Sequence, residues 1–203
     1  MRLFVTGIGT EVGKTIVSAI LTEALQADYW KPVQAGDLDW SDTLKVQAFI
    51  SNSKSTFHKE AFRLSYPMSP HAAAERDKVK IQLTDIQPPE TNNHLIIEGA
   101  GGLMVPLNNT DCIIDLIPQL DCEVVLVSRN YLGSINHTLL SIEALQKRNI
   151  SIKGIIFNGK ENKDTENVIL KMTSIPLLGR IDEEKSINKE TILKYAKQFK
   201  TVL

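Results

Sequence analysis

Cysteine is scarce in this chain, and long apolar runs are missing from it. Cys112 and Cys122 are the only cysteines, too few for a disulfide framework. They lack the spacing and the neighbouring histidines of a zinc site, so we interpret them as small buried hydrophobic residues in a reducing cytosol. No stretch approaches the roughly 18 apolar residues of a membrane span, and the opening MRLFVTG is too short for a signal peptide. We expect a cytoplasmic protein with no membrane partner.

An excess of charge of either sign is also missing. The 23 basic and 24 acidic residues give a formal net charge of -1, so we expect no nucleic-acid partner and no attraction to anionic lipid. The sequence has no repeat and no low-complexity tract. Its 203 residues are enough for one well-buried domain and few for two. We therefore expect a single domain over residues 1–203.

Short apolar runs alternate with stretches of helical periodicity. The runs are nearly continuous, which is typical of strands buried on both faces of a parallel sheet; they lie at 3–5, 95–97, 123–127 and 152–157. Helices are predicted over 15–27, 135–147 and 164–172, with an amphipathic helix over 191–203. This alternation predicts a three-layer α/β domain. Residues 52–94 hold four prolines and predict an irregular excursion with one or two helices over the active face, not a second domain.

The stretch GIGTEVGKT, residues 7–15, lies between a predicted strand and a predicted helix. Backbone N–H groups of such a turn point at phosphates. Gly13 lets the backbone approach closely, Lys14 neutralises β- and γ-oxygens, and the Thr15 hydroxyl can bind Mg²⁺. The loop has five residues between Gly7 and Gly13, one more than the strict pattern. The fold class we predict is α/β, a P-loop NTPase-like fold with a mostly parallel sheet flanked by helices.

Polar groups follow other predicted strands. A strand ending at Glu98 is followed by a glycine-rich loop; the carboxylate is either a Mg²⁺ ligand or a surface group before a turn. Lys31 ends another strand, and it lies either at the active site or in a pair with a nearby aspartate. Asp42 is either a site residue or a carboxylate at a helix N-terminus.

The stretch LGSINHTLL, residues 132–140, opens a predicted helix after a strand. Gly133 and Ser134 place free N–H groups at its N-terminus, which suits a carboxylate ligand, and Asn136 adds an amide donor. His137 is either a catalytic base or, more commonly at such a position, a packing or capping residue.

These blocks together resemble a known family over most of the chain. The blocks are VTGIGTEVGKT, KPVQAG, SD at 41–42, SPH at 69–71, EGAGG, LGSINH, FN at 157–158 and PLLG at 176–179. In order and spacing they resemble the dethiobiotin synthetases, ATP-dependent enzymes of biotin synthesis that also have a lengthened P-loop with Glu and Val before GKT. The resemblance implies a Mg-ATP-dependent cyclo-ligase acting on 7,8-diaminopelargonic acid (7,8-diaminononanoate) and CO₂. Its products are dethiobiotin, ADP and phosphate, formed through a carbamate and a carbamic–phosphoric anhydride.

The resemblance also implies residue roles. Lys31 and Lys14 would be catalytic, and Mg²⁺ would be held by Thr15, Asp42 and Glu98. The nucleotide would contact Glu11, Val12, Gly13, Lys14, Thr15, Ile16, Asp42, Glu98, Gly99, Ala100, Gly101 and Asn158. The diamine would contact Lys31, Ala35, Val105, Pro106, Gly133, Ser134 and Asn136. The family implies a homodimer in which the neighbouring subunit supplies Gly133, Ser134 and Asn136.

Two departures and two alternatives accompany this interpretation. Ala35 stands where relatives often have Ser or Thr, and Asp182-Glu183-Glu184 replaces a Pro-aromatic pattern on the adenine side. A P-loop switch ATPase of the partition or septum-site type is the main alternative, but Ile8 stands where that class usually has a second lysine. A small-molecule kinase would need an acceptor hydroxyl for which the sequence gives no sign.

Overall fold

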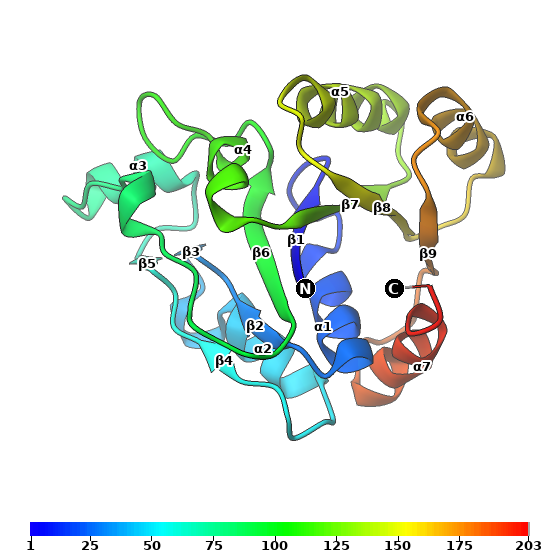
Figure 1. Ribbon diagram of the computed structural model, residues 1–203, viewed down its shortest axis with the longest axis horizontal. Helices are drawn as coiled ribbons and strands as arrows, with labels where there is room; N and C mark the ends of the chain where they lie inside the picture. The colour runs from blue at the N-terminus through cyan, green and yellow to red at the C-terminus, as the bar shows by residue number, and fades with distance from the viewer. Residues whose placement is uncertain (203) are drawn as a thin grey trace.

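Seven parallel strands form the central sheet, in the order β4-β2-β6-β1-β7-β8-β9. The computed structural model describes residues 1–202 (Figure 1). The strands of this sheet are β1 (Arg2–Gly7), β2 (Asp28–Trp30), β4 (Phe57–His58), β6 (Leu95–Gly102), β7 (Glu123–Arg129), β8 (Ile152–Asn158) and β9 (Leu177–Ile181). The prediction of an α/β fold with a mostly parallel sheet is confirmed.

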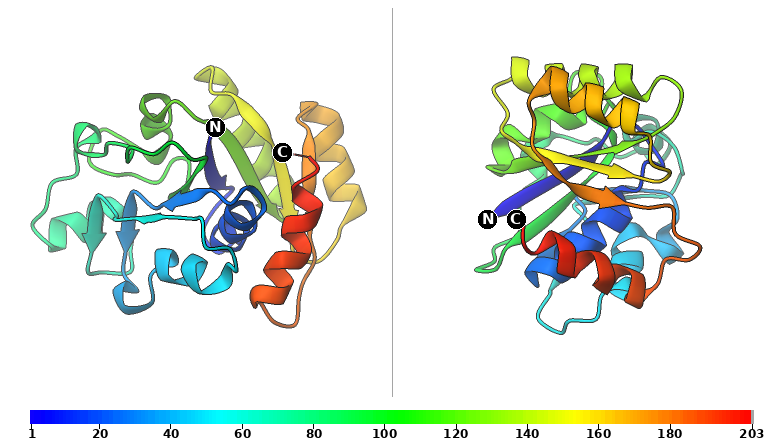
Figure 2. Two further views of the ribbon diagram at one scale, coloured as in Figure 1. Left: turned by 60° about the horizontal axis from the view of Figure 1, so that its bottom comes forward. Right: turned by 90° about the vertical axis from the view of Figure 1, so that its right-hand side faces the viewer.

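Helices cover both faces of the sheet and make three layers (Figure 2). One face carries α1 (Lys14–Leu25), α2 (Asp42–Phe49) and α7 (Lys189–Phe199), and the other carries α4 (Ile113–Leu116), α5 (Ser134–Lys147) and α6 (Lys163–Thr173). The short helix α3 (Pro70–Arg76) lies beside the strands β3 (Val33–Ala35) and β5 (Phe62–Leu64). Three 3₁₀ turns complete the elements: η1 (Leu38–Trp40), η2 (Leu83–Asp85) and η3 (Pro118–Leu120).

The core explains why the strand sequences are continuously apolar. Successive residues of β1 point to opposite faces: Leu3 and Val5 pack on the side of α1, and Phe4 packs on the other. All three are fully buried. A strand covered on both faces therefore needs an apolar residue at every position.

Residues 52–94 differ in part from the expectation. The predicted helix is present as α3, but the segment also contains β4 at the sheet edge and β5 (Phe62–Leu64). The strand β5 pairs with β3 (Val33–Ala35) in a separate two-stranded sheet. These strands have two or three residues each, too few to show a periodic pattern in the sequence.

The boundary predicted at Glu98 is wrong. The strand β6 continues through the glycines to Gly102, which pairs with Gly7 of β1. Glycine is depleted in strands, so a glycine-rich stretch was interpreted as a loop although its backbone is still paired. The predicted tail helix is α7, which ends at Phe199; Leu203 lies outside the described residues. Across residues 1–202, no helix has the length and apolar character to cross a membrane.

Candidate nucleotide and substrate site

The glycine-rich loop joins β1 to the N-terminus of α1, as predicted. Gly13 is the N-cap residue with φ 98°, a left-handed conformation that favours glycine. No side chain caps this helix, and its first turn closes with the bond from Val17 N–H to the Gly13 carbonyl at 3.0 Å. The preceding amides, including those of Thr15 and Ile16, are therefore available to an anion.

Lys14 folds back across this loop. Its Nζ donates a hydrogen bond to the Gly9 carbonyl at 2.9 Å, so the ammonium group lies over the concave side of the loop. Burial lowers the pKa of Lys14 to about 8, because a charge is costly away from water. A bound triphosphate would supply the negative charge that favours the protonated lysine.

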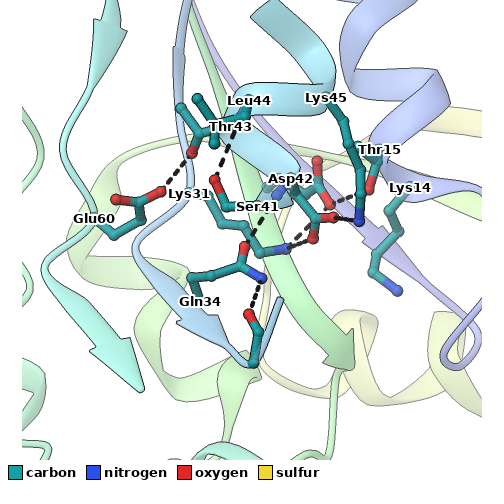
Figure 3. Close-up of polar contacts among 12 residues, drawn as sticks. Lys14, Thr15, Lys31, Gln34, Ser41, Asp42, Thr43, Leu44, Lys45 and Glu60 are labelled. Carbon is teal, nitrogen blue, oxygen red and sulfur yellow. Dashed lines mark hydrogen bonds and ion pairs between the residues drawn. The ribbon is translucent and has the colours of Figure 1, made fainter. Parts of the chain in front are cut away.

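Lys31 lies between two carboxylates next to the loop. Its Nζ is 2.7 Å from Asp42 Oδ2 and 3.1 Å from Glu98 Oε1. The Thr15 hydroxyl donates to the same Glu98 Oε1 at 2.9 Å. Figure 3 shows Lys31 and Lys45 reaching the Asp42 carboxylate from different sides, and Lys45 Nζ is 3.1 Å from Asp42 Oδ1. Four of the five residues predicted for catalysis and metal binding thus share one cluster: Thr15, Lys31, Asp42 and Glu98.

Electrostatics keep this cluster charged. Burial works against the charge of Lys31, but the carboxylates of Glu98 and Asp42 outweigh it and raise the pKa of Lys31 above its usual value. Burial likewise works against the charge of Asp42, and Lys31 outweighs it and lowers the pKa of Asp42. The site therefore holds the Lys31 ammonium and the Asp42 carboxylate as a charged pair at neutral pH.

Local hydrogen bonds fix where α2 presents Asp42. Ser41 is the N-cap, and its Oγ accepts from the Leu44 N–H at 3.4 Å. Gln34 Oε1 accepts from the Asp42 N–H at 3.2 Å, while Gln34 Nε2 donates to the Gly36 carbonyl at 2.9 Å. Figure 3 shows this arrangement around the start of α2. The helix start places the carboxylate of Asp42 beside Lys31.

A cavity of about 720 Å³ opens beside the cluster. Predicted site residues that line it are Glu11, Gly13, Lys14, Thr15, Ile16, Lys31, Ala35, Asp42, Glu98, Ala100, Gly101 and Val105. Residues 67–70 of the long excursion line it too, which confirms that this segment lies over the site.

Other predicted residues lie outside the cavity lining. Val12 is a buried residue of the loop itself, and Asn158 Nδ2 donates to the Val12 carbonyl at 2.8 Å. Gly99 packs against the Phe4 ring, and Pro106 pairs with Cys112 in an isolated bridge. The remaining three, Gly133, Ser134 and Asn136, are at the start of α5 and do not line this cavity.

The start of α5 is nevertheless a helix N-terminus, as predicted. Gly133 is its N-cap with φ 102°, and no side chain caps the helix. Asn136 is exposed. His137 Nδ1 is 2.7 Å from the Tyr131 hydroxyl, which favours the packing interpretation of this histidine over the catalytic one.

Among the polar residues of the site that sequence reasoning missed, three lie next to the charged cluster. Gln34 and Lys45 line the cavity, and Tyr29 donates its hydroxyl to Glu98 Oε2 at 2.8 Å. Lys45 follows Asp42 by one helical turn, and Tyr29 precedes Lys31 by two strand residues. Both spacings place the pairs on one face and could have indicated these residues. Nothing in the sequence distinguishes Gln34.

The oxygen ligands of the cluster suit Mg²⁺. Among residues 1–202, no three His, Cys, Asp or Glu side chains gather as a metal site. Magnesium, however, is commonly bound by one or two carboxylates together with waters and phosphate oxygens. Asp42 and Glu98 already converge on one cation, the Lys31 ammonium, so the geometry fits a cation between them.

A glycine-rich loop joins a central parallel strand to an uncapped helix, and lysine and carboxylate side chains lie beside this loop. Together these features define a P-loop nucleotide-binding protein. Solved structures with this fold include the septum site-determining protein MinD of Pyrococcus horikoshii (TM-score 0.64, 16% identity, covering 100% of this chain and 94% of that chain). Another is a plasmid partition protein of Borrelia burgdorferi (TM-score 0.58, 12% identity, covering 99% and 97%). At these identities the likeness shows the fold alone.

Sequence comparison is more specific. The AAA domain family matches residues 1–191. The ATP-dependent dethiobiotin synthetase BioD of Christiangramia forsetii is 58% identical, with 97% of this chain and 95% of the relative covered. That of Cytophaga hutchinsonii is 54% identical, with 96% and 95% covered, and that of Chlamydia abortus is 45% identical, with 98% and 95% covered. The chain belongs to the dethiobiotin synthetase family.

Proposed function

We propose that this protein is an ATP-dependent dethiobiotin synthetase, a cyclo-ligase that uses Mg²⁺. The observation that carries the proposal is the convergence of Lys14 and Thr15 from the P-loop with Lys31, Asp42 and Glu98 at one cavity. The family relationship supports the same conclusion. The substrates are 7,8-diaminopelargonic acid, CO₂ and ATP, and the whole chain acts as one synthetase domain.

The reaction begins when one amine of the substrate adds to CO₂ and loses a proton, giving a carbamate. A carbamate oxygen attacks the γ-phosphorus of ATP, and ADP leaves. The second amine then attacks the carbonyl carbon of the resulting carbamic–phosphoric anhydride. Phosphate leaves, the amine loses its proton, and the five-membered ureido ring closes. The protein's task is to align these groups and to balance their negative charge.

Position in the cavity supports the following residue roles. The P-loop amides from Glu11 to Ile16 and the Lys14 ammonium bind the triphosphate. Thr15, Asp42 and Glu98 hold Mg²⁺, which neutralises phosphate charge when bound. Lys31 then stabilises the carbamate and the transferred phosphoryl group. Ala35, Ala100, Gly101 and Val105 form the wall that faces the diamine.

The nucleobase contact is proposed at Asn158. Its Nδ2 already donates to the Val12 carbonyl, which fixes the amide beside the P-loop. Its Oδ1 remains the group that can accept from the adenine amino group. Gly99 supports the wall from behind, through its packing on Phe4.

A homodimer completes the site in this proposal. Gly133, Ser134 and Asn136 lie outside the cavity of their own chain, although their helix start suits a carboxylate. Apolar side chains near this helix start are exposed, among them Leu132, Leu140 and Met104. A second subunit that covers them would bring the start of α5 to the cavity of its neighbour, where it binds the substrate carboxylate.

The deciding experiment measures phosphate release from MgATP and bicarbonate, with and without 7,8-diaminopelargonic acid, together with the mass of the product. We expect release that depends on the diamine and a product heavier by one carbonyl group less two hydrogens. Release that ignores the diamine would favour the switch-ATPase alternative. Absence of release under both conditions would contradict the proposal.

A further inference from the structure

Tyr29 is a buried residue whose side chain makes, within residues 1–202, a single hydrogen bond, and that bond is to the proposed metal site. It lies on β2, two residues before Lys31, and its side chain is fully buried. Its hydroxyl donates to Glu98 Oε2 at 2.8 Å. A buried tyrosine hydroxyl needs a partner, but here the partner is a site carboxylate and not a backbone carbonyl.

The two oxygens of Glu98 are divided between different partners. Oε2 is held by Tyr29. Oε1 accepts from the Thr15 hydroxyl at 2.9 Å and from Lys31 Nζ at 3.1 Å. The Glu98 side chain is about 1% exposed, so water does not compete for either oxygen. Tyr29 therefore leaves Oε1 as the oxygen that Glu98 presents to the nucleotide side.

The sheet makes this division possible. In the β2–β6 pairing, Tyr29 lies beside Ile96 and Trp30 beside Ile97. Since side chains alternate along strands, Tyr29 and Glu98 lie on the sheet face that α1 covers, and Tyr29 reaches Glu98 diagonally. The contact joins two strands and does not depend on a loop.

We propose that Tyr29 is a positioning residue that sets the affinity of the site for Mg²⁺ by orienting Glu98. The inference rests on the proposed function, which assigns Glu98 as a magnesium ligand. Hydrogen-bonded partners that orient a ligating carboxylate tighten metal binding, and their removal typically weakens it by about 10- to 100-fold. Within residues 1–202, Tyr29 makes no hydrogen bond with Lys14 or with the P-loop amides, so binding of the nucleotide without metal should not need it.

The test uses Tyr29→Phe, which removes one oxygen and keeps the ring. Calorimetry measures ADP binding in EDTA, and then the Mg²⁺ concentration that restores tight binding. We expect that concentration to rise about 10-fold, with ADP affinity in EDTA unchanged. Tyr195→Phe is the matched control, because Tyr195 is also buried and donates its hydroxyl to a glutamate, Glu184, outside the cluster. Its Mg²⁺ dependence should equal that of the wild type.

A double-mutant cycle shows whether Tyr29 acts through Glu98. If it does, adding Tyr29→Phe to Glu98→Gln changes the Mg²⁺ dependence no further. The double variant has no buried charge at position 98, so it can still be measured if Tyr29→Phe alone folds poorly. Unchanged Mg²⁺ dependence in Tyr29→Phe would overturn the inference and leave the proposed function intact. An equal loss of ADP affinity with and without metal would overturn it in favour of a packing role. Wild-type protein whose ADP binding ignores Mg²⁺ would overturn the inference and the metal assignment together.

Discussion

At the scale of single residues, Lys31 is held by two buried ion pairs. Its ammonium group and the carboxylates of Asp42 and Glu98 are all at least four-fifths buried, at 5%, 19% and 1% exposure. In the proposed mechanism, Mg²⁺ binds the same carboxylate oxygens that pair with Lys31. Its binding would release the Lys31 ammonium from them and make it available to the carbamate and the phosphoryl group.

Removal of Lys31 should therefore affect both stability and turnover. Lys31→Ala leaves the buried Glu98 carboxylate without a cation and Asp42 with only the partly exposed Lys45, which costs about 3–5 kcal/mol. We expect urea unfolding in EDTA to show this loss, and added Mg²⁺ to restore more stability to the variant than to the wild type. The variant should still bind ATP and lose most turnover.

Lys45→Ala is the matched control for that prediction. Lys45 also pairs with Asp42, but its side chain is 26% exposed, and such partly solvated pairs contribute about 0–1 kcal/mol. Its unfolding curve should stay near that of the wild type. If Lys31→Ala proved as stable as Lys45→Ala in EDTA, the buried cluster would not hold the charges that its geometry implies.

At the scale of elements, the start of α2 sets the position of Asp42. Ser41 and Asn188 are N-caps of α2 and α7, and each accepts from the N–H three residues on, at 3.4 Å and 2.9 Å. Replacing either cap by alanine should cost about 1 kcal/mol, less at Ser41 because its bond is longer. Only Ser41→Ala should lower kcat/KM, on the order of 10-fold, since small displacements of site groups are costly. Thermal unfolding and steady-state kinetics measure both effects; equal activity losses in the two variants would indicate a general defect.

The edge of the sheet depends on another carboxylate, Asp28 of β2. It accepts from Thr56 N–H, Thr91 Oγ1 and Asn93 Nδ2, and it pairs with His58 of β4. Burial would raise the pKa of Asp28, but these hydrogen bonds outweigh it and lower the pKa below its usual value. A depressed folded-state pKa stabilises the protein above the unfolded value of about 3.9, and that stability is lost as the pH falls through the folded-state pKa.

Asp28→Asn should test that contribution. The variant should be less stable than the wild type at pH 7, and the difference should shrink as the pH falls below about 4. Urea unfolding of the variant and the wild type, from pH 7 down to below about pH 4, measures this difference in the free energy of unfolding. Glu143→Gln, at an exposed pair on α5, should show a much smaller trend, because solvent screens that pair. A difference that stays constant down to low pH would mean that Asp28 acts by packing and not by its charge.

The elements also show which parts of the structure the sequence could predict. The strands β1, β7 and β8 are buried along most of their length and were found from their nearly continuous apolar runs. The helices α1, α5 and α6 were found because burial on one face leaves a periodic pattern. The strands β3, β4 and β5 were missed because they are too short for a period, and β6 was shortened because glycine hides a paired backbone. At the site, Lys14, Thr15, Lys31, Asp42 and Glu98 were predicted together. Tyr29, Gln34 and Lys45 were not, since their importance comes from the neighbours that the fold gives them.

At the scale of the whole molecule, the proposed homodimer predicts that the start of α5 serves the cavity of the neighbouring chain. Leu132, just before this helix start, is fully exposed, and Leu140 and Met104 are more than half exposed. Met104 and Leu140 line an apolar cavity of about 380 Å³, together with Ile8, Leu103 and Ala144. Exposed apolar groups that gather in this way are typical of protein interfaces. The proposed homodimer would bury them and bring Asn136 to the neighbouring cavity.

Mixed dimers test this arrangement directly. Lys31→Ala disables the cavity of its own chain, and Asn136→Asp places a negative charge against the substrate carboxylate while keeping a residue that suits a helix N-terminus. If sites are shared, a heterodimer of these two variants has one site with both changes and one with neither. It should therefore recover about half of the wild-type activity, although both parent homodimers are nearly inactive. Two different affinity tags isolate the heterodimer for the assay.

The control heterodimer combines Lys31→Ala with Lys14→Ala, two changes on the same side of the proposed shared site. Each of its cavities then carries one defect, so it should stay inactive whether or not the subunits associate. Recovery in both heterodimers would point to stabilisation by association alone. In a two-fold arrangement, each cavity takes its carboxylate-binding helix from the other chain, so the Lys31→Ala and Asn136→Asp heterodimer must keep one undamaged site. Absence of recovery in this heterodimer would therefore mean that Asn136 does not serve its neighbour's cavity.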